Sequence, residues 1–151
     1  MHRKIDSVEA MKTFGQELGR LLEGGETITL VGDIGAGKTT LVKGIAAGLG
    51  IEEEVQSPSF TISRVYDSPS GVRLAHYDFY RLNDPGIMRT ELHESANDKQ
   101  IITVIEWADI VTDVLPDDFI EISLVATDEE SRQLTLIASG EYENKFSELF
   151  A

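Results

Sequence analysis

Residues 27–50, TITLVGDIGAGKTTLVKGIAAGLG, decide the fold of this 151-residue chain. Residues 27–31 are apolar and β-branched, a composition typical of a short buried strand. Residues 32–39 then fit the pattern G-x-x-x-x-G-K-[ST] at every position. Beyond them, apolar residues recur at helical spacing as far as Gly50, where a helix-ending glycine belongs. The stretch predicts a strand, a phosphate-binding loop (P-loop) and a helix.

The residue types of the loop explain how it would hold phosphate. Glycines at three of its positions let the backbone turn, so that its N–H groups and the helix N-terminus face an anion. Lys38 is expected to reach the β- and γ-phosphates, and the hydroxyl of Thr39 is expected to bind Mg2+. A glycine-rich turn with a chance lysine is the alternative, which the flanking strand and helix disfavour. The predicted nucleotide-binding residues of the loop are Asp33, Ile34, Gly35, Ala36, Gly37, Lys38, Thr39 and Thr40.

Length, composition and charge limit the function classes. With 41% hydrophobic residues, the chain suffices for one buried core but not for two ordinary domains, so we expect a single domain over residues 1–151. The absence of cysteine excludes disulfides, thiolate metal sites and cysteine nucleophiles. The sequence lacks the long apolar segment of a signal peptide or a membrane span, so we expect a cytoplasmic location. The net charge of −14 disfavours direct nucleic-acid binding; it fits docking onto a basic protein surface, or simply solubility.

Periodic patterns outside the P-loop unit complete the expected fold. Asp6 and Glu9 stand at capping-box spacing before an apolar stripe, which predicts an amphipathic helix ending at Gly24-Gly25. Gly44 and Gly48, one turn apart, predict close packing of the P-loop helix on the sheet. Further helices are expected within 84–97, over 108–115 and at the C-terminus. We expect a hairpin over 61–66 and 72–82, a parallel strand buried on both faces over 101–105, and an antiparallel pair over 119–125 and 132–138.

These elements predict an α/β fold of the P-loop NTPase kind. Its central sheet is expected to be mostly parallel, with an antiparallel hairpin, antiparallel edge strands and helices on both faces.

Two acidic positions are candidates for chemistry. Alternation along the second hairpin strand places His76, Asp78 and Tyr80 on one face. They form either a functional constellation at the phosphate end or a polar, solvent-facing side of the hairpin. Glu106 ends the predicted parallel strand, where a magnesium-site acid of the Walker B type belongs; a surface carboxylate that merely ends a strand is the alternative.

Two other motifs, one for zinc and one for guanine nucleotides, are incomplete in this sequence. His93-Glu94 begins like the zinc motif H-E-x-x-H, but Asn97 takes the place of the second histidine. Residues 144–147 read Asn-Lys-Phe-Ser, which lacks the aspartate of the N-K-x-D element that binds guanine, and no D-x-x-G switch occurs. The expected nucleotide is therefore ATP, with Mg2+.

Several motifs together resemble the bacterial TsaE (YjeE) family, over nearly the whole chain. Their order and spacing match that family, and other P-loop ATPases lack several of them. The resemblance implies an ATPase subunit that docks on the TsaB–TsaD heterodimer and supports formation of threonylcarbamoyladenosine in tRNA, with little direct tRNA binding. The motifs are DIGAGKTT at 33–40, GLG at 48–50, SPSF at 57–60, HYDFYRL at 76–82 and IEW at 105–107.

The resemblance also implies roles for individual residues. Asp78 would act in hydrolysis, and Glu106 would complete the magnesium site with Thr39. Trp107 would lie at the nucleotide or partner face, and Arg132 would match an arginine that approaches the nucleotide. The loop over 57–60 resembles a switch in which Ser59 replaces the family threonine and keeps its hydroxyl.

The expected mechanism is in-line attack of water on the γ-phosphate. Lys38, Mg2+ and the P-loop N–H groups would neutralise developing charge, and Asp78 or Glu106 would orient the water. No arginine finger is evident in the sequence, so slow hydrolysis alone and faster turnover with the partner are expected. A small-molecule P-loop kinase and a non-catalytic nucleotide switch are the rival functions.

Overall fold

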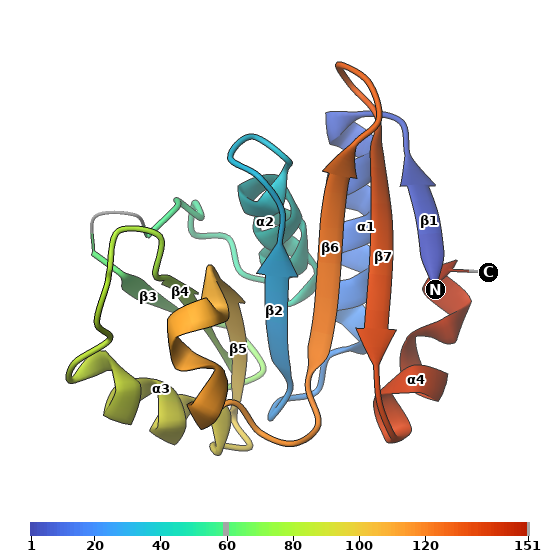
Figure 1. Ribbon diagram of the computed structural model, residues 1–151. Coiled ribbons are helices and arrows are strands. Elements are labelled where there is room, and N and C mark those ends of the chain that lie inside the picture. Colours follow the sequence, from blue (N-terminus) through green and yellow to red (C-terminus); the bar gives the residue numbers. More distant parts are fainter. Residues whose placement is uncertain (59–60, 151) are drawn as a thin grey trace.

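The computed structural model describes residues 1–58 and 61–150 (Figure 1). Within them, a seven-stranded sheet has the order β1-β7-β6-β2-β5-β4-β3. The strands are β1 His2–Ile5, β2 Thr27–Val31, β3 Ser63–Asp67, β4 Arg73–Asp78, β5 Ile101–Glu106, β6 Ile120–Ala126 and β7 Arg132–Ala138. The helices are α1 Val8–Leu21, α2 Lys38–Gly48, α3 Met88–Ala96 and α4 Glu141–Phe146, with 3-10 helices η1 Ala108–Val114 and η2 Ser147–Phe150.

The centre of the sheet is parallel. Strand β2 pairs in parallel with β5 on one side and β6 on the other, and β4 pairs in parallel with β5. The pairs β3–β4, β6–β7 and β1–β7 are antiparallel. The predicted fold class is therefore confirmed, with edge strand β1 added. The loop that follows β2 leaves the middle of the sheet, where strands on both sides support it.

Helices cover both faces of the sheet, as predicted. Helices α1 and α2 lie together on one face (Figure 1), and their buried side chains form one core with inward residues of the strands. On the other face, Leu92 of α3 and Val111 of η1 pack with Tyr77 and Ile105. Burial, and next the Glu91 carboxylate, raise the pKa of Tyr77 to about 12, so this phenol stays neutral. In the described part of the chain, no helix combines the length and apolar character needed to cross a bilayer.

Two local predictions are corrected. The N-cap of α1 is Ser7, whose side-chain oxygen accepts a hydrogen bond from the Ala10 N–H at 3.0 Å, so Asp6 lies outside the helix. Strand β4 ends at Asp78, four residues before the predicted end at Leu82, because the chain turns there and the Leu82 N–H bonds to the carbonyl of Phe79. Tyr80 therefore does not share a strand face with His76.

The glycines of α2 face another helix, against the prediction that they pack on the sheet. A Cβ at Gly44 would lie 2.5 Å from the carbonyl oxygen of Lys12 and 2.8 Å from the Cα of Gly15, both in α1. A Cβ at Gly48 would likewise meet the backbone of Gln16. The glycines allow α1 and α2 to approach backbone to backbone, which fixes the position of α2 and hence of the loop before it.

Replacing Gly44 with alanine should destabilise the protein. The added methyl group has no room, since the atoms it would meet are backbone atoms that cannot rotate away. We expect the free energy of unfolding to fall by about 1–3 kcal/mol in urea titrations. Lys43→Ala, at an exposed position of the same helix, is the control and should change it by less than about 0.5 kcal/mol. An unchanged Gly44→Ala variant would contradict this account of the helix contact.

Candidate functional site

The P-loop joins β2 to α2 in a shape that leaves backbone N–H groups available. Gly35 and Gly37 have φ values of +84° and +106°, in the left-handed region that favours glycine. Helix α2 begins directly after Gly37, and no side chain caps it. The first N–H groups of an α-helix have no partner within the helix, and they attract anions. The loop and the helix start together can bind phosphate.

A cavity of about 420 Å³ adjoins the loop. It unites the P-loop with the ends of β4 and β5, because these parallel strands are neighbours and Asp78 stands opposite Glu106 in their register. The carboxyl ends of parallel strands are where ligands bind in open α/β sheets. The cavity is lined by Ile34, Gly35, Gly37, Lys38, Thr39, Thr40, Ser57, Asp78, Tyr80, Arg81, Glu106 and Trp107.

Lys38 holds a buried ammonium group at this cavity. Its Nζ donates a hydrogen bond to the carbonyl oxygen of Gly32 at 2.6 Å and lies 4.0 Å from Oε1 of Glu106. The same atom lies 4.3 Å from the ring centroid of Trp107, a cation–π distance. The residue is only 6% exposed, so a phosphate that enters would meet a cation poorly screened by water.

Both carboxylates are buried, so two of the open alternatives are wrong. Glu106 is not a surface residue that merely ends a strand: it is 3% exposed, and its Oε2 lies 2.6 Å from Nε2 of the fully buried His76. Asp78 is 6% exposed, and its Oδ1 accepts a hydrogen bond from the Tyr80 N–H at 2.9 Å. The face that carries His76 and Asp78 is therefore not the solvent-facing side of a hairpin.

Trp107 forms one wall of the cavity in an unusual conformation. Its φ and ψ are 57° and 54°, the left-handed region that a residue with a side chain seldom adopts. This turn separates β5 from η1 and brings the indole beside Tyr80, with ring centroids 4.8 Å apart. Backbone strain of this kind costs energy and is found mainly at functional sites.

Two lining residues, Arg81 and Ser57, were not predicted individually as site residues from the sequence, whereas Tyr80 belonged to the candidate constellation with His76 and Asp78. Arg81 lies three residues after Asp78 in the motif HYDFYRL, and this proximity is the signal that could have found it. Ser57 opens the loop that resembles a switch. No arginine finger was evident in the sequence, but the structure places Arg81 of this chain in the lining of the cavity.

Some predicted residues lie elsewhere. Asp33 and Ala36 belong to the loop but do not line the cavity; the carbonyl of Asp33 accepts a hydrogen bond from the Ala36 N–H. Ser59 lies outside the described residues. Arg132 does not line the cavity either.

Arg132 binds carbonyl oxygens of the P-loop. Its Nε donates to the carbonyl oxygen of Ala36 at 3.0 Å, and its Nη2 donates to that of Gly35 at 3.3 Å. Its Nη1 donates to the carbonyl of Ser131 at 2.9 Å, in the turn before β7. In that turn, N–H groups of Ser131 and Glu130 hold the pKa of the Asp128 carboxyl below its usual value. Arg132 thus ties the loop carbonyls to β7.

The described residues fit a magnesium ion that arrives with a nucleotide. They contain no group of three or more histidine, aspartate or glutamate side chains placed to hold a metal by themselves. Mg2+ bound with nucleotides commonly takes one or two protein oxygens together with phosphate oxygens and water. The hydroxyl of Thr39 and the carboxylate of Glu106, both at the cavity, are protein ligands of this type.

Comparison with known proteins decides the family. The chain matches the family described as "Threonylcarbamoyl adenosine biosynthesis protein TsaE" over residues 5–134. The chain belongs to the TsaE family. Proteins named tRNA threonylcarbamoyladenosine biosynthesis protein TsaE are similar to it: that of Streptomyces coelicolor is 34% identical, over 87% of this chain and 92% of that protein. That of Treponema pallidum is 37% identical, over 86% of this chain and 95% of that protein.

A solved structure shows the same fold. The crystal structure of YdiB from Bacillus subtilis matches with a TM-score of 0.80 and 30% sequence identity, over 99% of this chain and 93% of that one. The family match and the similar relatives confirm the resemblance to the TsaE family, and the solved structure confirms the P-loop fold.

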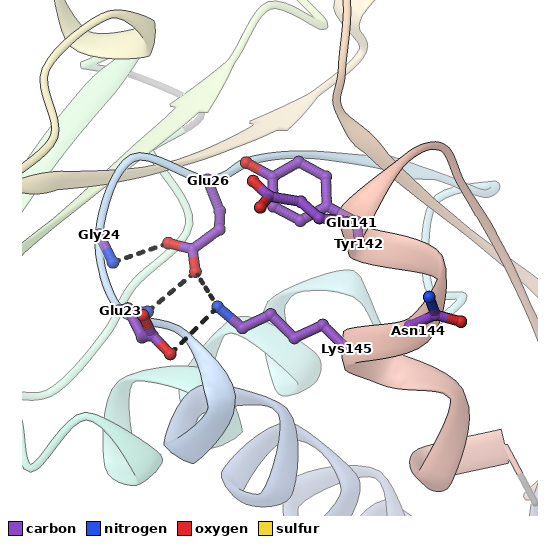
Figure 2. Close-up of a pocket in the computed structure, with 7 residues that line it drawn as sticks. All are labelled: Glu23, Gly24, Glu26, Glu141, Tyr142, Asn144 and Lys145. Atoms are coloured by element: carbon purple, nitrogen blue, oxygen red, sulfur yellow. Dashed lines mark hydrogen bonds and ion pairs between the residues drawn. The ribbon is translucent and has the colours of Figure 1, made fainter.

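Figure 2 shows a second cavity, of about 490 Å³, where α4 meets the loop between α1 and β2. The buried Glu26 accepts hydrogen bonds from the N–H groups of Glu23 and Gly24 at 2.9 and 2.7 Å, and from Nζ of Lys145 at 3.0 Å. Burial, followed by the Glu26 carboxylate, raises the pKa of Tyr142 beside it. Glu26 precedes β2, so this cavity lies at the opposite end of that strand from the P-loop. Its ion pair fastens the C-terminal helix to the sheet.

Arg132→Ala should loosen the P-loop before any nucleotide is present. Losing the bonds to two loop carbonyls is expected to speed amide hydrogen exchange in residues 33–37 by about fivefold to tenfold. Exchange followed by NMR in the nucleotide-free protein measures this directly. The exposed Glu130→Ala, in the same turn, is the control. Unchanged exchange with weaker nucleotide binding would instead favour the direct nucleotide contact predicted from the sequence.

Lys145→Met should lower the free energy of unfolding by about 1–3 kcal/mol, since the buried Glu26 carboxylate would keep only its backbone donors. Urea unfolding provides the measurement, with the exposed Lys43→Met as the matched control. A change no larger than that of the control would show that this ion pair does not hold α4 in place.

Proposed function

We propose that this protein binds ATP with Mg2+ and hydrolyses it slowly, in support of tRNA threonylcarbamoyladenosine modification by a TsaB–TsaD complex. One observation carries the proposal: Lys38 and Glu106, both buried, lie at the same cavity as the uncapped start of α2. A cation, a carboxylate and free N–H groups around one cavity fit a metal-bound polyphosphate. Membership of the TsaE family supports the pathway, and the family resemblance suggests the partners; a cytoplasmic location remains the expectation drawn from the sequence.

Different residues of the chain would bind phosphate, hold the metal and orient water. Lys38 would exchange the carbonyl of Gly32 for phosphate oxygens, which it can do because this bond is made by one mobile side chain. Thr39 and Glu106 would hold Mg2+, which supplies neutralisation of phosphate charge when bound. Asp78 is the candidate for orienting water, since its buried carboxylate lines the cavity and the Tyr80 N–H fixes the position of its Oδ1.

Arg81 supports partner-stimulated turnover. This residue lines the cavity but is exposed, so water screens its charge when the protein is alone. A partner that covered this side of the cavity would exclude water and strengthen the action of Arg81 on the γ-phosphate. Hydrolysis is therefore expected to be slow alone and faster in the complex.

Substitutions at Lys38 and Asp78 separate binding from hydrolysis. Lys38→Ala should weaken binding of MgATP by about tenfold to a hundredfold, because a hydrogen-bonded charge is lost. Asp78→Asn should bind MgATP within about threefold of the unchanged protein but hydrolyse it roughly a hundredfold more slowly. Calorimetry and phosphate release, with and without TsaB–TsaD, measure the two effects.

Three outcomes would contradict the proposal. Full ATPase rate with no response to TsaB–TsaD would remove the coupling to the partner. Unchanged pathway activity of both Asp78→Ala and Glu106→Ala, with loss in Lys38→Ala, would indicate a non-catalytic switch. Phosphoryl transfer to a small acceptor would indicate a kinase.

A further inference from the structure

We propose that His76 is the positioning residue of Glu106. Its ring holds one oxygen of the carboxylate, so that the other oxygen is presented to the cavity and to the metal. This inference rests on the proposed function, because it assigns the orientation of a magnesium ligand. It concerns a residue that the mechanism above does not use.

The sheet brings the two side chains together. His76 lies on β4 two residues before Asp78, and Asp78 stands opposite Glu106 on the parallel neighbour β5. Nε2 of His76 lies 2.6 Å from Oε2 of Glu106, and hydrogen bonds to a charged carboxylate are short. The imidazole is fully buried and Glu106 is 3% exposed, so water does not compete for this bond. The orientation of the carboxylate is thereby fixed by protein alone.

The two oxygens of Glu106 have different neighbours. An ionised carboxylate only accepts hydrogen bonds, so Nε2 of His76 carries the hydrogen and donates it to Oε2. Oε1 is the oxygen near Lys38, at 4.0 Å from Nζ. Oε1 is thus left for a metal, while Oε2 is occupied. Carboxylates that ligate metals are commonly held by a second hydrogen bond of this kind.

The other ring nitrogen argues against a purely structural role. Nδ1 of His76 is buried and has no hydrogen-bond partner among the described residues. A buried polar atom without a partner is destabilising, and most are satisfied in native proteins. An apolar side chain would fill this position without that penalty. Among the described residues, the hydrogen bond to Glu106 is what favours an imidazole over an apolar side chain at this position.

Two variants of similar size separate hydrogen bonding from packing. In His76→Gln the side-chain amide can donate a hydrogen from nearly the same place as Nε2, whereas His76→Leu fills the space without a donor. For each protein, calorimetry gives the affinity for AMP-PNP with saturating Mg2+ and in EDTA. The ratio of the two affinities is the gain that Mg2+ provides, and the EDTA value controls for damage to the P-loop.

We expect His76→Leu to lose about tenfold of this gain, with its EDTA affinity unchanged, and His76→Gln to keep most of it. In a Glu106→Gln background, His76→Leu should cause no further loss, because the ligand that it positions is already altered. Thermal unfolding of each variant verifies that it is folded under the conditions of the titration.

The outcomes distinguish this inference from the proposed function. A gain in His76→Leu equal to that of the unchanged protein would overturn the role of His76 and leave the proposed function standing. Equal losses in the leucine and glutamine variants would also overturn it, since the donor would then not matter. If the unchanged protein bound no AMP-PNP, or bound it without any gain from Mg2+, the proposed function itself would fail.

Discussion

Among the described residues, no side chain caps the start of α2, and the rest of the structure is arranged around that helix start. The contrast with α1 is direct: Ser7 caps α1 with its side chain, whereas α2 starts after Gly37 with no side-chain cap. A helix start left this way in the middle of a sheet is stabilised by an anion. An anion is therefore the kind of ligand that this helix start favours.

The surrounding scaffold keeps this helix start in place. Gly44 meets the backbone of α1, so α2 cannot shift along the sheet without opening that contact. Arg132 does not line the cavity, and it holds the loop through the carbonyl oxygens of Ala36 and Gly35. At the far end of β2, Glu26 and Lys145 fasten the terminal helix. These contacts stabilise the fold, whereas the cavity holds ionisable side chains whose burial is energetically unfavourable.

The cost is visible in three neighbouring side chains. Lys38 and Glu106 are nearly buried ionisable groups, and His76 beside them leaves a ring nitrogen without a partner among the described residues. Buried charge is expensive unless it is paired and hydrogen-bonded. Trp107 adds backbone strain at the same place. Stability alone would not select this combination, which is why it indicates a site.

The sequence by itself determined the features that depend on neighbours along the chain. The strand, glycine-rich loop and helix of residues 27–50 follow from local spacing, and so do the parallel strand that ends at Glu106 and the family resemblance. Only the tertiary structure decided the partners of residues far apart in sequence: His76 with Glu106, Arg132 with the loop carbonyls, and Gly44 with α1. The physical reason is that periodicity reports which face of an element is apolar, but not which other element covers it. That choice is made by packing the whole chain at once, and it turned a histidine with two open interpretations into a buried partner of the acid at the cavity.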